Sequence, residues 1–201
     1  AASPTPATAA VAASPASAAT ILPAWDFAAG EPLGWYPTHD LALFALDGEG
    51  LHSRSTGGDP YMVGPNIEVA ASAAWYVDVR MRLSKGSDAQ LFWVTADDGK
   101  YDEAKSQHFP VQGDGAWHAY RVRVHDNPAW KGVITQLRLD PLGAADAEIA
   151  IARIEVLGAQ PGALVVRTFG PAGAVAAAGQ PFTVRAQARN AGDAEVGEGT
   201  L

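Results

Sequence analysis

The sequence predicts an all-β protein, and three observations support that prediction. In residues 117–124, His118 and Tyr120 share a face with two valines, and the opposite face carries Trp117 and two arginines, which is the period-2 pattern of a strand. Residues 133–140 alternate in the same way, and the residues between the two segments favour a turn. About ten such segments follow one another without helical periodicity, so the crossover helices of a parallel sheet are not expected.

The predicted strands follow one another along the chain at short intervals. In order they are residues 24–27, 41–46, 50–54, 67–69, 75–83, 89–95, 105–111, 117–124, 133–140 and 147–157. Turn residues rich in Gly, Asp and Pro separate them. The clearest strand is 75–83, where every second residue is apolar, whereas 41–46 lacks alternation and is expected to be covered on both faces. Short antiparallel strands at this spacing predict a jelly-roll β-sandwich.

The composition changes at both ends of this predicted sandwich, which gives three parts. Residues 1–20 consist almost entirely of Ala, Pro, Ser and Thr and are predicted to be a disordered tail. Residues 21–158 form the sandwich. Residues 163–201 contain two further strand patterns, too few for an independently stable sheet, and are interpreted as part of a second β module that continues in a larger protein.

Charge and residue usage exclude several classes of function. The net charge of −8 and the scattered distribution of the 14 Lys and Arg residues argue against a nucleic-acid partner. The chain has no Cys, which excludes disulfides and thiol nucleophiles. No apolar run reaches the roughly 18 residues of a membrane-spanning helix, so membrane insertion is not expected. The five His residues show no zinc-protease spacing.

Several sequence blocks between Trp25 and Gly158 resemble a known class of module. They are WDFA at 25–28, GW at 34–35, QLFWVT at 90–95, GAWHAYRVRV at 115–124, PAWKGVITQLRLDP at 128–141 and IARIEVLG at 151–158. They resemble the galactose-binding-like jelly-roll carbohydrate-binding modules of secreted bacterial polysaccharide-active proteins. The segment PFTVRAQARNAGDAEVG resembles the opening strands of an immunoglobulin-like spacer domain. The resemblance implies a non-catalytic module of a secreted or cell-surface protein, with a polysaccharide or oligosaccharide as ligand and neighbouring domains in the same chain.

Aromatic residues in predicted loops are the candidate ligand-binding residues, because sugar rings stack on exposed aromatic rings. They are Trp35, Tyr36, Tyr61, Tyr101 and Trp130. The alternative for each is that the ring caps one end of the core. The tryptophans at 25, 75, 93 and 117 lie inside predicted strands and are expected in the core.

A structural Ca²⁺ ion is a further expectation. The resemblance implies that such an ion would lie between the first and last strands, at Asp26 and Glu155. Independently, the residues from Asp97 to Glu103 form the densest acidic cluster, although their spacing does not match a helix-flanked calcium loop.

Three functions are compared on these grounds. The first is non-catalytic carbohydrate binding, which the strand pattern, the loop aromatics and the resemblance favour. The second is a structural spacer without ligand, in which the same aromatics serve the core. The third is a glycan hydrolase or lyase, which requires converging carboxylates that the sequence does not indicate.

Overall fold

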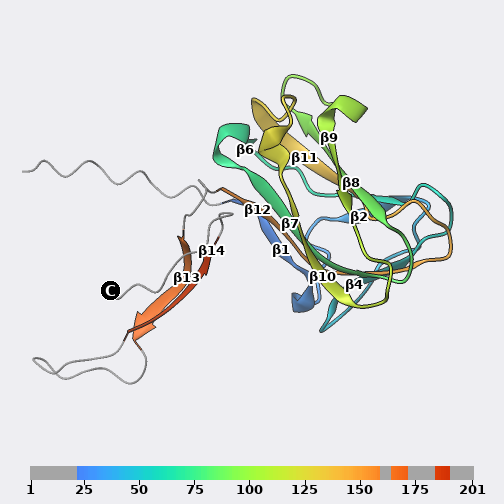
Figure 1. Ribbon diagram of the computed structural model, residues 1–201, viewed down its shortest axis with the longest axis horizontal. Helices are drawn as coiled ribbons and strands as arrows, with labels where there is room; N and C mark the ends of the chain where they lie inside the picture. Colours follow the sequence, from blue (N-terminus) through green and yellow to red (C-terminus); the bar gives the residue numbers. More distant parts are fainter. Residues whose placement is uncertain (1–21, 159–163, 172–183, 191–201) are drawn as a thin grey trace, which may run out of the picture.

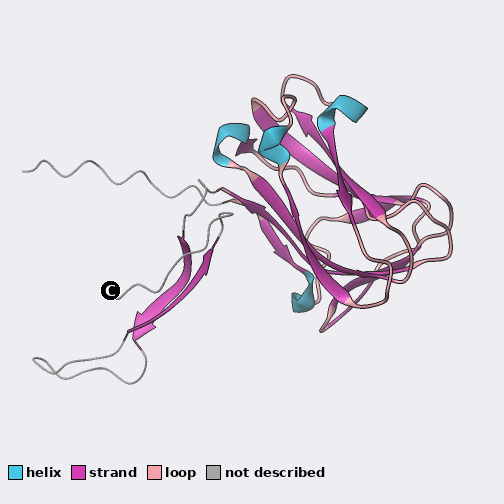
Figure 2. Ribbon diagram, viewed as in Figure 1, coloured by secondary structure: helices cyan, strands magenta, loops and turns pink. Residues whose placement is uncertain are grey.

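The structure is a computed structural model that describes residues 22–158, 164–171 and 184–190. Two antiparallel sheets pack face to face, and loops with a few short 3-10 turns connect their strands (Figure 1 and Figure 2). The first sheet contains β10 (Trp117–Val122), β7 (Tyr76–Leu83), β12 (Glu148–Leu157), β4 (Gly50–Arg54) and β3 (Ala45–Asp47), with β1 (Ala24–Asp26) paired to β12. The second contains β2 (Tyr36–His39), β5 (Tyr61–Val63), β11 (Val133–Asp140), β8 (Asp88–Thr95) and β9 (Ser106–Pro110), with β6 (Val69–Ala70) paired to β11.

The chain passes repeatedly from one sheet to the other, as in a jelly roll. Strand β4 of the first sheet is followed by β5 of the second, and β7, β9 and β11 are each followed by a strand of the opposite sheet. The four 3-10 turns are η1 (Phe27–Ala29), η2 (Ala71–Ala73), η3 (Glu103–Lys105) and η4 (Val124–Asp126). The predicted all-β jelly-roll sandwich is confirmed.

The core lies between the inner faces of the two sheets. Every second residue of β7 points inward, including Val77, Val79 and Met81, each at most 1% exposed. Opposite them, the inner faces of β8 and β11 contribute Trp93 and Leu137 among others. Because successive side chains of a strand point to opposite faces, the residues between the core residues lie on the outer faces of the sheets.

Two short strands of the second sheet were not predicted. Strands β2 and β5 occupy segments that were predicted to be loops. Pro37 and Pro60, which disfavour strands, lie within β2 and directly before β5. Conversely, residues 41–46 form only an isolated bridge at Leu41 and the start of β3. Leu43 is 86% exposed, so the expectation that this segment is covered on both faces is wrong.

Strands β13 (Leu164–Pro171) and β14 (Val184–Asn190) pair with each other in an antiparallel two-stranded sheet. This agrees with the two strand patterns expected in residues 163–201. The predicted tail, residues 1–20, lies outside the described residues, as do the remaining parts of the proposed immunoglobulin-like module. Among the helical segments of the described chain, none has the length and apolar character needed to cross a membrane.

Candidate tyrosine surface

The candidate functional site is the outer face of the second sheet, where strand register gathers residues that are far apart in sequence. Tyr36 on β2 is opposite Val63 on β5, Val63 is opposite Arg138 on β11, and Arg138 is opposite Phe92 on β8. These four residues form one row across four neighbouring strands, which spans about 14 Å at the usual strand spacing. The sheet therefore brings an aromatic side chain to each end of a row with an arginine between them.

Arg138 occupies the middle of this face and is held on several sides. Its guanidinium forms two hydrogen bonds to the carboxylate of Asp140, at 2.7 and 2.5 Å. It also lies 3.5 Å from the ring centroid of Tyr61 and 4.6 Å from that of Phe92. A bidentate Arg–carboxylate pair fixes the guanidinium plane, and the aromatic rings stack on its faces. Arg138 is thus a rigid centre for the aromatic rings around it.

Tyr101 adds a third tyrosine from the loop between β8 and β9. Its hydroxyl donates a hydrogen bond to the side-chain oxygen of Gln136 at 2.9 Å, and Gln136 in turn donates to the carbonyl of Gly64 at 2.9 Å. The Tyr101 ring lies 5.8 Å from the Arg138 guanidinium. We call Tyr36, Tyr61, Tyr101 and Arg138 the tyrosine surface.

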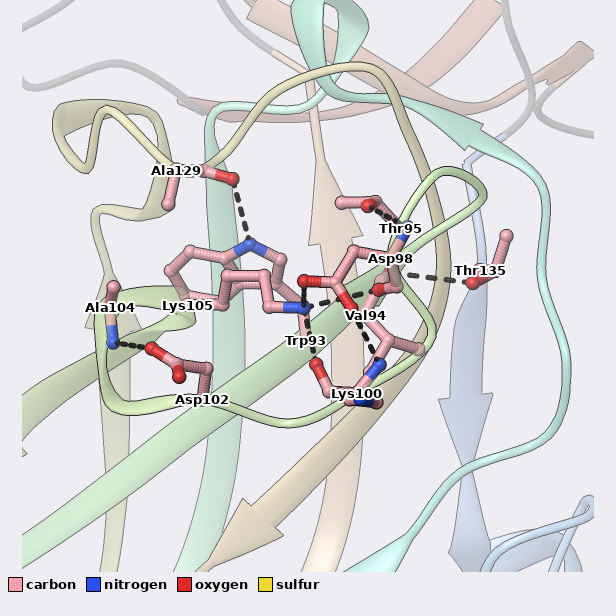
Figure 3. A network of polar contacts seen from close by, with 10 residues as sticks. All are labelled: Trp93, Val94, Thr95, Asp98, Lys100, Asp102, Ala104, Lys105, Ala129 and Thr135. Carbon is pink, nitrogen blue, oxygen red and sulfur yellow. Dashed lines mark hydrogen bonds and ion pairs between the residues drawn. The ribbon is translucent and has the colours of Figure 1, made fainter.

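The loop that carries Tyr101 is tied down by a buried ammonium group (Figure 3). Lys105 is 7% exposed, and its Nζ pairs with the Asp98 carboxylate at 2.9 Å. The same ammonium donates to the backbone carbonyls of Asp98, at 3.1 Å, and of Lys100. Lys105 therefore places a positive charge inside the acidic cluster of residues 97–103, which is the second region where the sequence suggests a Ca²⁺ ion.

An apolar layer lies beneath the tyrosine surface. Val63, Phe92 and Val94 are each at most 5% exposed, although they do not belong to the core between the sheets. Since Arg138 and Tyr101 contact Phe92, the surface side chains cover this layer and keep water from it. The tyrosines thereby pack on a buried apolar layer while part of each ring stays accessible to solvent, with Tyr36 49% exposed.

Burial alters the ionisation of two groups in this surface. Burial raises the pKa of Tyr101 to about 12, and the nearby Tyr36 hydroxyl adds to the effect. Burial likewise raises the pKa of Asp140, although the hydrogen bond and charge of Arg138 act in the opposite direction. At neutral pH Tyr101 is therefore an uncharged phenol that can donate one hydrogen bond and accept another.

The structure divides the five candidate aromatics into two groups. Tyr36, Tyr61 and Tyr101 lie together on the tyrosine surface, although the first two are on strands rather than in the expected loops. Trp35 and Trp130 are only 2% and 7% exposed and belong to the core, and neither lies on the tyrosine surface. Their burial favours the alternative that they cap the core.

Sequence reasoning missed the polar half of this surface. Gln136, Arg138 and Asp140 alternate with the apolar residues of the predicted strand 133–140, and only the pairing of β11 with β5 and β8 places them beside aromatic rings. Their spacing at every second residue was the available signal, since it puts all three on one face. That spacing does not reveal which other strands share the face.

Asp26 and Glu155 do not form a calcium cage in this structure. The Asp26 carboxylate accepts a hydrogen bond from the backbone of Ala28, and Glu155 pairs with the Arg153 guanidinium at 3.1 Å. No group of three or more His, Cys, Asp or Glu side chains suited to a metal occurs among the described residues. Calcium takes six to eight oxygen ligands. These two carboxylates, one of them beside a guanidinium, do not fit the ion.

Two of the four strand tryptophans are not buried as expected. Trp25 and Trp93 are core residues, but Trp75 and Trp117 remain partly exposed. Trp117 lies on the outer face of the first sheet, 4.9 Å from the guanidinium groups of both Arg80 and Arg82. Trp75 precedes β7 and stacks on His125.

Comparison with known proteins gives a structural likeness only. No family model and no curated protein sequence matches the chain. A solved mutant of CBM29-2, a family 29 carbohydrate-binding module, superposes with a TM-score of 0.50 at 9% identity, covering 69% of this chain and 88% of its own. The xylan-binding module CBM86 from Roseburia intestinalis gives 0.46 at 12% identity, covering 70% and 97%. A family 11 carbohydrate-binding module of a Clostridium thermocellum cellulase gives 0.46 at 11% identity, with the same coverage. At these identities the likeness describes the fold.

Proposed function

We propose that this protein is a non-catalytic carbohydrate-binding module and that the tyrosine surface holds a polysaccharide or oligosaccharide chain. The observation that carries the proposal is the gathering of three partly exposed tyrosines around one fixed arginine on a single sheet face. Sugar rings offer apolar C–H faces to aromatic rings, and their hydroxyls need oriented polar groups. The tyrosine surface extends from Tyr36 on β2 to Arg138 on β11 and to Tyr101 beside it, so it can contact more than one sugar ring.

The charges around the surface favour uncharged sugars. The Arg138 guanidinium is already paired with Asp140, and the Asp59 carboxylate lies 4.0 Å from it. Glu103 accepts a hydrogen bond from Gln90 near the same face. A carboxylate or sulfate on the ligand would meet these negative charges without an unpaired cation to compensate. We therefore expect the tyrosine surface to bind a neutral glycan more tightly than an acidic one.

The same pairing supports a binding role rather than catalysis. A general acid or base must exchange a proton with its substrate, and Asp140 is buried and occupied by two hydrogen bonds from Arg138. We further propose that the module belongs to a secreted or cell-surface glycan-active protein and that neighbouring domains, including an immunoglobulin-like one, follow in the same chain. The likeness of the fold to carbohydrate-binding modules supports this placement.

Affinity electrophoresis and titration calorimetry with xylan, mannan and mixed-linkage glucan test the proposal. Tyr36→Ala is expected to weaken binding by at least about fivefold, because it removes an aromatic contact at an interface. It should change the free energy of unfolding by no more than about 0.5 kcal/mol, since Tyr36 is 49% exposed.

Leu43→Ala is the matched control, since it removes an exposed apolar side chain outside the tyrosine surface. It should leave both affinity and stability unchanged. Failure of the folded protein to bind any polysaccharide, or an equal effect of Tyr36→Ala and Leu43→Ala, would overturn the proposal and favour a structural spacer.

A further inference from the structure

A second aromatic hollow lies at one end of the sandwich and shares no residue with the tyrosine surface. It has a volume of about 540 Å³ and is lined by Trp75, His125 and Trp130, together with Ser72 and Lys131. This volume falls within the range of small-molecule sites in proteins. The lining comes from η2, η4 and the residues beside them, and these two turns lie at the same end of the molecule (Figure 2).

The aromatic walls of this hollow are held rigidly. The Trp75 ring stacks on His125 with centroids 4.4 Å apart and an interplanar angle of 23°. His125 is itself fixed at both ring nitrogens, by the Trp75 carbonyl at 3.0 Å and by Asp126 at 3.0 Å. The Trp130 indole N–H donates to the carbonyls of Ala71 and Ala74. A ring that is already immobilised loses little conformational entropy when a ligand stacks on it.

The charge of the hollow differs from that of the tyrosine surface. Lys131 is exposed, and in the described part of the chain no carboxylate lies within 4.0 Å of its ammonium group. The Asp97 carboxylate lies near the lining residue Gly132, and the Asp126 carboxylate pairs with Arg123 at 2.8 Å and with His125 at 3.0 Å. Ser72 adds an exposed hydroxyl. The hollow thus combines an aromatic wall, a hydroxyl and an unpaired cation.

We propose that this hollow binds one acidic sugar unit, with the sugar ring against Trp75 and its carboxylate or sulfate paired with Lys131. A hydrogen bond between two charged groups contributes more than one between neutral groups. The protein would then contact glycans at two places of different charge preference, with neutral chains on the tyrosine surface and acidic units at the end of the sandwich.

Binding of three probes tests this proposal: oligogalacturonate for the carboxylate, a sulfated galactan for the sulfate, and uncharged galactan. At least one acidic probe should bind the Tyr36→Ala variant, whose tyrosine surface is weakened, more tightly than the uncharged probe does. Lys131→Gln should weaken that binding by about tenfold, as expected for loss of a charge-assisted hydrogen bond. Lys85→Gln, which removes an exposed positive charge elsewhere, is the matched control and should have no effect.

Trp75→Phe should reduce the change in tryptophan fluorescence on adding the acidic probe, because only Trp130 then remains in the lining, and it retains an aromatic ring for folding. Tyr36→Ala should leave acidic binding unchanged, which separates this site from the tyrosine surface. Equal binding of acidic and uncharged probes to Tyr36→Ala, no acidic binding at millimolar concentration, or equal effects of Lys131→Gln and Lys85→Gln would each overturn the proposal.

Discussion

Replacing each of three buried tryptophans by phenylalanine should destabilise the protein by different amounts, because their indole N–H groups make different numbers of hydrogen bonds. Trp35, Trp93 and Trp130 are 2%, 0% and 7% exposed. The Trp35 N–H has no hydrogen-bond partner among the described residues, whereas the Trp93 N–H donates to the Ala129 carbonyl at 3.2 Å. The Trp130 N–H donates to two carbonyls, at 2.8 and 3.1 Å. The same substitution therefore removes none, one or two hydrogen-bonded contacts.

The expected gap follows from these partners. Each Trp→Phe change removes a similar part of the ring, so the loss of apolar burial is a common cost. A buried hydrogen bond contributes about 1 kcal/mol, and a buried polar group without a partner costs about 1 to 3 kcal/mol. Trp35→Phe removes such an unpaired group, while Trp130→Phe leaves two carbonyls without their donor. We expect Trp130→Phe to cost about 2 kcal/mol more than Trp35→Phe, with Trp93→Phe between them.

Urea unfolding followed by circular dichroism measures this difference, because the slope with denaturant should be the same for all three variants. Trp35→Ala provides a reference, since emptying the whole site should cost about 3 to 5 kcal/mol. The reasoning would be refuted if Trp35→Phe destabilised the protein as much as Trp130→Phe did, because the partners of the indole N–H would then not decide the cost.

Three further predictions concern the loop, the pH dependence and the metal. Burial raises the pKa of Tyr101 from 10.0 to about 12, so the stability that depends on its protonated form is complete below about pH 10 and lost between about pH 10 and 12. Urea unfolding across that range should show this loss in the native protein and a smaller loss in Tyr101→Phe. Lys105→Met should speed hydrogen exchange in the loop from 96 to 102 and weaken polysaccharide binding, whereas Lys100→Met, at an exposed position of the same loop, should do neither. Calcium should shift the thermal midpoint by less than about 1 °C in differential scanning fluorimetry, because Asp26 and Glu155 supply too few oxygens; a larger shift that Asp26→Asn abolished would contradict this.

The neighbours Trp35 and Tyr36 illustrate how far sequence reasoning reached. Both were predicted as loop aromatics open to a ligand. Trp35, however, packs in the core with its ring centroid 5.4 Å from that of Trp25, whereas Tyr36 is 49% exposed. Because β2 is short and contains Pro37, the period-2 pattern that would have separated the two residues was not recognised. A longer strand such as β7 has enough alternating residues for its buried face to be predicted correctly.

What the sequence by itself determined is the class of fold and the buried faces of the long strands, because apolar alternation and turn residues act over a few neighbouring positions. The tertiary structure alone decided which aromatic rings stay at the surface and which polar groups join them. Arg138 meets Tyr61 and Phe92 only because β11 pairs with β5 on one side and β8 on the other. Such neighbours come from strands far apart in the chain, and local patterns carry no information about that pairing.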